Sequence, residues 1–223
     1  MKLKPSDRAA RRWLLTAFAA AACGTAIAAP ATSAAPAPVV LVVGDSLSAE
    51  YGLARGQGWV ALLQQKLEKS MPQARVVNAS VSGDTTAGGR ARLASLLQQH
   101  KPTVVVIELG GNDALRGLPL SGTRDNLQAM TRASQAAGAK VLLLGMQVPP
   151  NYGSAYARDF ASVFPEVGKQ NKAAWLPFLL TGIADGPDAM SWFQPDRIHP
   201  LAKAHPRMLD NVWPHLQPLL RQP

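Results

Sequence analysis

The sequence is poor in cysteine and in charge. Cys23 is the single cysteine among 223 residues, which excludes an intramolecular disulfide framework and a thiolate metal cage. Charged residues make up 17% of the chain and apolar residues 47%, so one domain can bury a core and general disorder is excluded. The four histidines lack a metal-binding spacing such as His-Glu-x-x-His, so we expect no metal centre.

The excess of positive charge is concentrated at the N-terminus. The formal net charge is +9, and residues 1–12 alone carry five basic residues against one acid. An apolar stretch from Trp13 to Ala22 and the small residues Ala26-Ile27-Ala28 follow, which is the pattern of a secretory signal peptide. The stretch is too short for a transmembrane helix, which needs about 20 apolar residues. We therefore expect residues 1–28 to be removed and the protein to be periplasmic or secreted.

Two other export routes fit the same segment. Arg11-Arg12 before the apolar run resembles a twin-arginine signal, and the residues around Cys23 loosely resemble a lipoprotein cleavage site that would leave this cysteine lipidated.

Residues 29–38 form a Pro/Ala-rich linker, so the folded domain is expected to span 39–223. Residues 29–223 hold 18 basic residues against 13 acidic ones without a polybasic run. This argues against nucleic-acid binding but is compatible with transient contact with membrane lipids.

Short β-branched runs alternate with longer amphipathic ones after Val39. Strands are predicted at 39–43, 75–78, 103–109 and 139–146, with a weaker one at 175–180. Helices are predicted at 59–70, 86–99, 121–137, 155–172 and 201–220. The third and fourth strands are apolar on both faces, as parallel strands covered by helices on each side must be. The pattern predicts a three-layer α/β/α sandwich around a five-stranded parallel sheet.

Polar motifs follow the predicted strands. Gly-Asp-Ser-Leu, with Ser46, follows the first strand, a Ser-Gly-Asp segment with Gly83 follows the second, and Gly-Gly-Asn-Asp with Asn112 follows the third. Asp196 and His199 stand close together before the last helix. Because ligand sites of parallel sheets lie beyond the carboxyl ends of the strands, we expect all of these segments to meet at one edge.

These residue types together favour nucleophilic acyl transfer. A serine hydroxyl needs a general base within hydrogen-bond reach and a third group that orients the base. Ser46 is therefore a candidate nucleophile, His199 a candidate base and Asp196 the candidate orienting acid. The backbone N–H groups of Ser46 and Gly83 and the side-chain amide of Asn112 are candidate oxyanion donors. Taken singly, each motif has an ordinary interpretation as a turn, a helix cap or a loop.

The ordered set of motifs resembles that of the SGNH hydrolases, also called GDSL-type esterases. The four residues that give this family its name match Ser46, Gly83, Asn112 and His199. The likeness runs from about residue 39 to residue 220. Longer stretches, such as Glu-Leu-Gly-Gly-Asn-Asp-Ala-Leu-Arg-Gly and Pro-Pro-Asn-Tyr-Gly, are similar to the periplasmic branch of thioesterases, lysophospholipases and arylesterases.

The resemblance implies a flavodoxin-like fold, a Ser-His-Asp triad, and neither a metal nor an organic cofactor. It implies hydrolysis of acyl esters and thioesters, as an acyl-CoA thioesterase, lysophospholipase or arylesterase. The loop with Gln147, Val148 and Tyr152 is expected to contact the acyl group. At Arg197 the chain departs from its relatives, which often have glycine there, so this side chain is expected to influence which substrates enter. We expect a small-molecule acyl substrate and a monomeric chain.

Two other functions are compatible with parts of this pattern. A carbohydrate O-acetyl esterase would share the fold and the triad, because a fold does not fix the substrate. A binding protein without chemistry would be expected to have lost Ser46, Asn112 or His199, and all three are present.

Overall fold

The computed structural model describes residues 37–221. The predicted signal peptide, residues 1–28, and most of the predicted linker, residues 29–38, lie outside the described residues. Within 37–221 no helix has the length and apolar character needed to cross a membrane. In the same range no three His, Cys, Asp or Glu side chains are grouped as metal ligands would be.

A parallel sheet of five strands forms the centre of the fold, in the order β2-β1-β3-β4-β5. The strands are β1 (Val39–Gly44), β2 (Arg75–Asn78), β3 (Val104–Glu108), β4 (Lys140–Leu144) and β5 (Ala174–Leu176). β3 is buried along its whole length and β1 along nearly all of it, because helices cover both faces. Their apolar sequences are what a parallel strand between two helical layers requires. The predicted sheet is confirmed.

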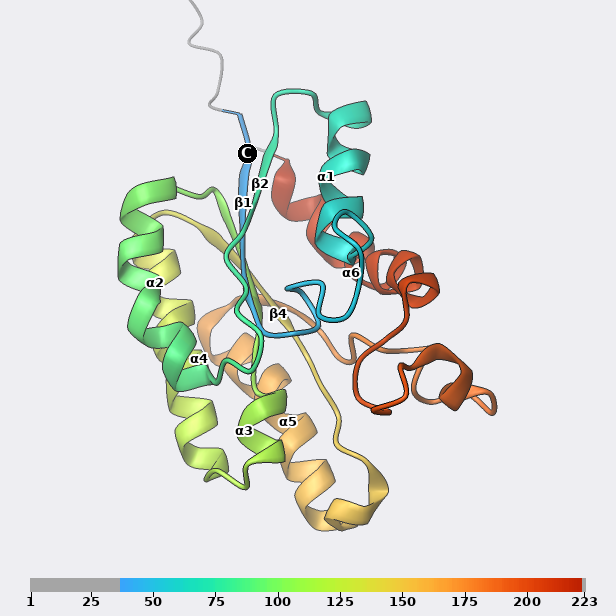
Figure 1. Ribbon diagram of the computed structural model, residues 1–223. Helices are drawn as coiled ribbons and strands as arrows, with labels where there is room; N and C mark the ends of the chain where they lie inside the picture. The colour runs from blue at the N-terminus through green and yellow to red at the C-terminus, as the bar shows by residue number, and fades with distance from the viewer. Residues whose placement is uncertain (1–36, 222–223) are drawn as a thin grey trace, which may run out of the picture. The chain divides into compact units, whose positions relative to one another are not determined.

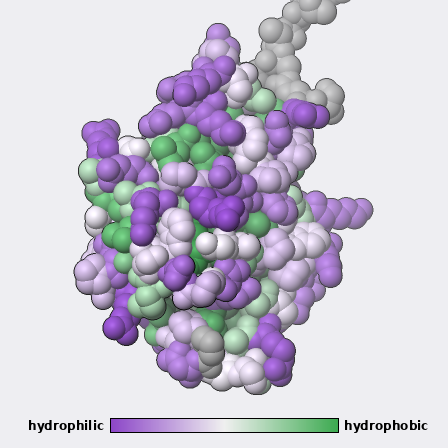
Figure 2. All heavy atoms as spheres, turned by 90° about the vertical axis from the view of Figure 1, so that its right-hand side faces the viewer, coloured by the Kyte–Doolittle hydropathy of each residue, from purple (hydrophilic) through white to green (hydrophobic). Residues whose placement is uncertain are grey.

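Helices cover both faces of this sheet, as Figure 1 shows. On one face lie α1 (Trp59–Ser70) and α6 (His205–Leu220), and on the other lie α2 (Thr86–His100), α4 (Leu120–Ala136) and α5 (Ser154–Asn171). Apolar side chains form one stripe along α1 and are buried: Trp59, Val60, Leu63 and Leu67. On the outer surface, seen from the side of α1 and α6 in Figure 2, hydrophilic and apolar residues are interspersed. The predicted three-layer sandwich with flavodoxin-like strand order is confirmed.

The structure departs from the sequence prediction most clearly at three places. β5 ends at Leu176 rather than near residue 180, because Pro177 has no N–H to offer the sheet and the chain turns there. A short helix that the sequence analysis does not predict, α3 (Gly111–Leu115), follows β3 directly. The last helix begins at His205 rather than Leu201, since a 3-10 turn precedes it and a proline occupies its first turn.

The strand order reverses between β1 and β3. The chain passes from β1 through α1 to β2 on one side, and from β3 through α4 to β4 on the other. The segments that follow these two strands therefore diverge at the carboxyl edge of the sheet, and open α/β sheets place their ligands at such a point. Ser46 follows β1 and Asn112 follows β3, so the fold brings both to this switch point.

Candidate active site

Ser46 lies in a tight turn directly after β1. The carbonyl oxygen of Asp45 accepts hydrogen bonds from the backbone N–H groups of Ser48 (3.2 Å) and Ala49 (2.9 Å). The carboxylate of Asp45 accepts a further one from the N–H of Leu47 (3.1 Å), so the side chain and the main chain of Asp45 both fix the turn. The hydroxyl of Ser46 is thereby held at the end of the strand, facing the segment before α6.

His199 and Asp196 complete a hydrogen-bonded row with Ser46. The Nε2 atom of His199 lies 2.9 Å from the Oγ atom of Ser46. Its Nδ1 atom lies 2.7 Å from the Oδ2 atom of Asp196. The row spans 153 positions of sequence, and the structure brings its three members together as the sequence predicts. This geometry suits a base that takes a proton from the serine while the acid fixes the ring.

Asp196 is well supplied with hydrogen-bond donors. Its Oδ1 atom accepts from the backbone N–H groups of Ile198 (2.9 Å) and His199 (3.0 Å), while Oδ2 faces the imidazole. Partial burial raises the pKa of Asp196, but the two N–H groups and the adjacent imidazole outweigh it and lower the pKa to about 2. The carboxylate is therefore ionised wherever His199 is neutral, and it favours the tautomer with the proton on Nδ1.

Arg197 stands in the loop between Asp196 and His199. Arg197 has a φ of 60°, in the left-handed region where glycine is at ease and other residues are strained. The glycine that the family resemblance leads us to expect at this position would fit the same backbone. The arginine side chain is exposed, and the N–H groups of Ile198 and His199 in this loop donate to Asp196.

Two residues that the sequence analysis missed support the row from outside. The ring of Tyr51 lies against the ring of His199, with centroids 4.2 Å apart and planes tilted by 35°. The side-chain amide of Gln194 donates to the carbonyl oxygens of Tyr51 (2.9 Å) and Pro200 (3.2 Å), so it ties the nucleophile segment to the histidine segment. Neither residue stands in a recognisable motif, and only the fold brings them to the site.

The candidate oxyanion donors flank the serine turn. Gly83 follows β2 and has a φ of 78°, which places its backbone in the left-handed region. Asn112 lies in α3, and its Nδ2 atom donates to Oδ2 of Asp45 at 3.0 Å, which leaves the second amide hydrogen available. The guanidinium of Arg116 donates to the carbonyl oxygen of Gly83 at 2.6 Å and so joins the two loops.

A buried aspartate fixes the loop that carries Asn112. Asp113 is 2% exposed and accepts hydrogen bonds from the backbone N–H of Thr86 (2.9 Å) and the hydroxyl of Thr123 (3.2 Å). Thr86 begins α2 and Thr123 lies in the first turn of α4, so Asp113 joins three helices beneath the site. The last residue of the Gly-Gly-Asn-Asp motif therefore has a structural role that its neighbour Asn112 depends on.

The residues predicted to contact the acyl group lie at the same edge of the sheet. Gln147 and Val148 stand in the loop after β4, and Tyr152 stands in the 3-10 turn before α5. Tyr152 stacks on Tyr156 at 6.2 Å, and Tyr156 on Phe160 at 6.3 Å, which anchors the turn to the core. Among the described residues no hydrogen bond joins these three to the serine or the histidine. Their role in binding stays a prediction.

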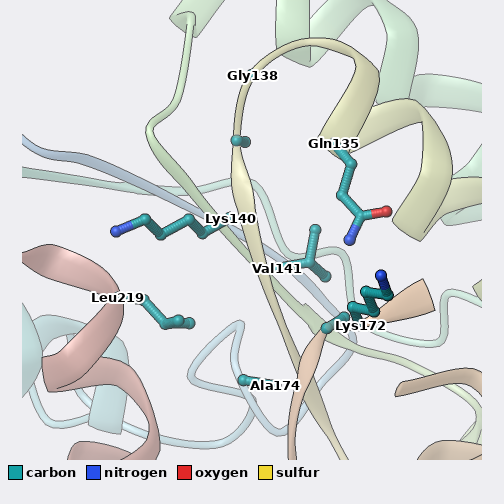
Figure 3. A pocket seen from close by; sticks show the side chains of 9 residues that line it. Gln135, Gly138, Lys140, Val141, Lys172, Ala174 and Leu219 are labelled. Atoms are coloured by element: carbon teal, nitrogen blue, oxygen red, sulfur yellow. The ribbon is translucent and has the colours of Figure 1, made fainter. Parts of the chain in front are cut away.

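A cavity of about 500 Å³ lies at the opposite edge of the sheet. Figure 3 shows it beside the beginnings of β4 and β5, where Gln135, Lys140, Lys172 and Leu219 surround it. Parallel sheets place their chemistry at the carboxyl edge, and the row of Ser46, His199 and Asp196 lies there. The cavity is therefore separate from the candidate active site.

Comparisons with known proteins identify the family of this chain. The GDSL-like lipase/acylhydrolase family model matches residues 42–207. Esterase TesA of Pseudomonas aeruginosa is 53% identical over 189 residues, covering 85% of this chain and 92% of that protein. Thioesterase 1/protease 1/lysophospholipase L1 of Escherichia coli K12 is 41% identical over 187 residues, covering 84% and 87%.

A solved structure agrees in fold as well as in sequence. The psychrotrophic esterase EstA of Pseudoalteromonas sp., in a structure inhibited by monoethylphosphonate, superposes with a TM-score of 0.76 at 40% identity. The match covers 82% of this chain and 99% of that one. The chain therefore belongs to the GDSL-like lipase/acylhydrolase family.

Proposed function

We propose that this chain is a serine esterase that hydrolyses acyl esters and thioesters through an acyl-enzyme intermediate. The observation that carries the proposal is the row of hydrogen bonds from Ser46 through His199 to Asp196, at 2.9 Å and 2.7 Å. The names of the relatives, an esterase and a thioesterase/lysophospholipase, support the same class of reaction.

The proposed reaction has two halves. Oγ of Ser46 attacks the carbonyl carbon of the substrate while Nε2 of His199 takes the hydroxyl proton, and the same nitrogen then gives that proton to the departing alcohol or thiol. Water next attacks the acyl-enzyme, again with His199 as the base, and the acid product leaves. Asp196 carries the negative charge that stabilises the imidazolium during both halves.

The developing oxyanion requires donors that are in place before the reaction. We assign this role to the backbone N–H groups of Ser46 and Gly83 and to the free amide hydrogen of Asn112. The hydrogen bond from Asn112 to Asp45 supports this role, because it fixes the amide before substrate arrives. Removal of one such donor typically lowers the rate by about 10²-fold to 10³-fold.

The substrate we propose is a small acyl ester or thioester, with Gln147, Val148 and Tyr152 in contact with the acyl group. Exposed apolar side chains on the segments at this edge, among them Tyr51, Leu115 and Ile198, favour an apolar acyl chain and transient contact with membrane lipids. Removal of residues 1–28 on export is likewise proposed, and sequencing the N-terminus of the mature protein tests it.

A panel of p-nitrophenyl esters and acyl-CoA thioesters, from acetyl to palmitoyl, tests the function. The mature protein should hydrolyse members of this panel and react with a fluorophosphonate, while Ser46→Ala should do neither and should keep its far-UV circular dichroism spectrum. Acetylated carbohydrates in the same panel test the O-acetyl esterase alternative. Hydrolysis by a folded Ser46→Ala variant would contradict the proposal.

A further inference from the structure

A carboxyl group lies buried beneath the serine turn. Glu108 is the last residue of β3, follows four apolar residues and is fully buried. It pairs with Gly44 across the sheet, and a Cβ at Gly44 would lie only 2.9 Å from the Oε2 atom of Glu108 and the Oγ atom of Ser48. The glycine therefore leaves the space that the carboxyl group occupies. A buried carboxyl is costly unless it is neutral or fully hydrogen-bonded, so its protonation state matters.

The two carboxyl oxygens of Glu108 differ in their hydrogen-bond partners. Oε2 accepts from the hydroxyl of Ser48 (2.7 Å) and the backbone N–H of Asp45 (3.3 Å). Trp59 donates its indole N–H to the same hydroxyl (3.1 Å), so the single proton of Ser48 is free to point at Glu108. Oε1 is buried, and no donor in the described part of the chain contacts it. An oxygen without a donor is the one suited to carry a proton itself.

The acceptor for such a proton is Asp45. Asp45 is 3% exposed, its carboxylate accepts from Leu47 and Asn112, and its backbone N–H donates to Oε2 of Glu108 at 3.3 Å, so the two carboxyl groups are neighbours. N–H donors favour the ionised form of Asp45, and two adjacent buried carboxyls cannot both be ionised. Burial and the charge of Asp45 raise the pKa of Glu108 well above its usual value. Burial raises the pKa of Asp45 to about 6, an increase limited by its hydrogen bonds and by the nearby His199.

We infer that Glu108 is a positioning residue, which keeps its carboxyl proton and donates it to Asp45, so that Asp45 stays ionised and orients Asn112 for the oxyanion. The inference rests on the proposed role of Asn112. The groups that titrate around the pair are the two carboxyls themselves and His199, on the segment facing the serine turn. Without the proton of Glu108, Asp45 acquires a proton more readily and no longer accepts from Asn112.

Two substitutions separate this role from mere packing. Glu108→Met keeps the length of the side chain but has no donor, and it should lower kcat by about tenfold or more with little change in KM, as misdirection of one oxyanion donor predicts. Glu108→Gln donates from its amide to Asp45 and accepts from Ser48, so it should retain most of the activity. The acid limb of the kcat profile should move to higher pH in Glu108→Met only. Equal losses in both variants, or an unchanged pH profile in Glu108→Met, would overturn the inference.

A double-mutant cycle with Asn112→Ala tests the route of the effect. If Glu108 acts through Asn112, Glu108→Met should cost little further activity once the amide is gone. If the fold-losses of activity of the two single variants multiply in the double variant, Glu108 acts independently of Asn112. That result would count against the inference.

Direct detection of the proton does not depend on activity, and its main observation is made on the wild-type protein. Carboxyl carbon NMR on wild-type protein labelled at the glutamate side chains should show one carboxyl that is still protonated at pH 7, and Glu108→Gln should lack that signal. If every glutamate is ionised at pH 7, the inference fails whatever the enzyme hydrolyses. If fluorophosphonate does not label Ser46 while the protonated signal is present, it is the proposed function that fails instead.

Discussion

Two acidic regions flank Ser46, and they differ in exposure and in charge state. The side chain of Asp196 is 37% exposed, and neighbouring N–H groups and the imidazole, against the opposing effect of burial, lower its pKa to about 2. Asp45 is 3% exposed, and burial raises its pKa to about 6. The exposed acid is ionised without the aid of a second carboxyl and serves the base. The buried acid serves the oxyanion side, and it depends on a second carboxyl for its charge.

The largest effect is expected on the exposed side. Asp196→Asn should lower kcat by roughly 10³-fold to 10⁴-fold, because an amide donates to Nδ1 where the carboxylate accepts, and this favours the wrong tautomer of His199. Steady-state kinetics with a p-nitrophenyl ester measure it, with the exposed Asp125→Asn on α4 as a control that should match the wild type. A loss below tenfold would show that the orienting acid matters little in this enzyme.

A smaller but still large effect is expected on the buried side. Asp45→Asn should lower kcat by about 10²-fold, because its amide nitrogen faces the amide nitrogen of Asn112 and the oxyanion donor loses its orientation. The same kinetic assay measures this, with KM compared beside kcat. If Asp45→Asn cost as much as Asp196→Asn, the division into a base side and an oxyanion side would fail.

The buried His205 extends the comparison from activity to stability. It is 2% exposed and accepts from the backbone N–H of Trp59 at 3.0 Å, and burial lowers its pKa to about 4. Because the unfolded imidazole titrates near 6.5, the unfolded state binds more protons between these values. The free energy of unfolding is therefore not affected by the protonation of His205 above about pH 6.5, where the imidazole is neutral in both states. It decreases by about 3 kcal/mol as the pH falls from there towards 4.

Urea unfolding across this pH range measures the effect. His205→Gln should show a shallower fall in the free energy of unfolding than the wild type, whereas His215→Gln on the same helix should fall as steeply as the wild type. Equal slopes for His205→Gln and the wild type would contradict a neutral, buried His205.

The smallest effect is expected at Arg197. Arg197→Gly removes the strain of a left-handed arginine, roughly 1 kcal/mol, but gives the unfolded chain more freedom by a similar amount. Thermal unfolding should therefore change little, and kcat on acetyl and butyryl esters should stay close to that of the wild type. A large loss of kcat would show that the side chain, rather than the backbone of this loop, supports His199.

The sequence predicts the fold and the reacting groups better than it predicts what supports them. Ser46, Asn112 and His199 stand in motifs whose order along a parallel sheet determines where they meet. Glu108 and Tyr51 acquire their roles only through partners in the fold, such as Ser48, which stands 60 positions before Glu108. One signal was present, since a carboxyl closes the otherwise apolar run Val-Val-Val-Ile-Glu.

The end of β5 shows a second limit of the sequence pattern. An apolar run continues through Phe178–Leu180 and these residues are buried, yet Pro177 ends the strand before them. Burial and strand structure coincide in the middle of this sheet but separate at its edge, where a proline and the turn after it decide the backbone. Apolar periodicity alone does not resolve that difference.

The most direct test of the central claim is the detection of the acyl-enzyme. The mature protein is mixed with a p-nitrophenyl ester, quenched with acid within the first turnover and examined by mass spectrometry of the intact chain and its peptides. The account predicts one added acyl group, on the peptide that contains Ser46, and none in Ser46→Ala. Release of p-nitrophenol by wild-type protein with the acyl group on another residue, or an equal burst from Ser46→Ala, would contradict it.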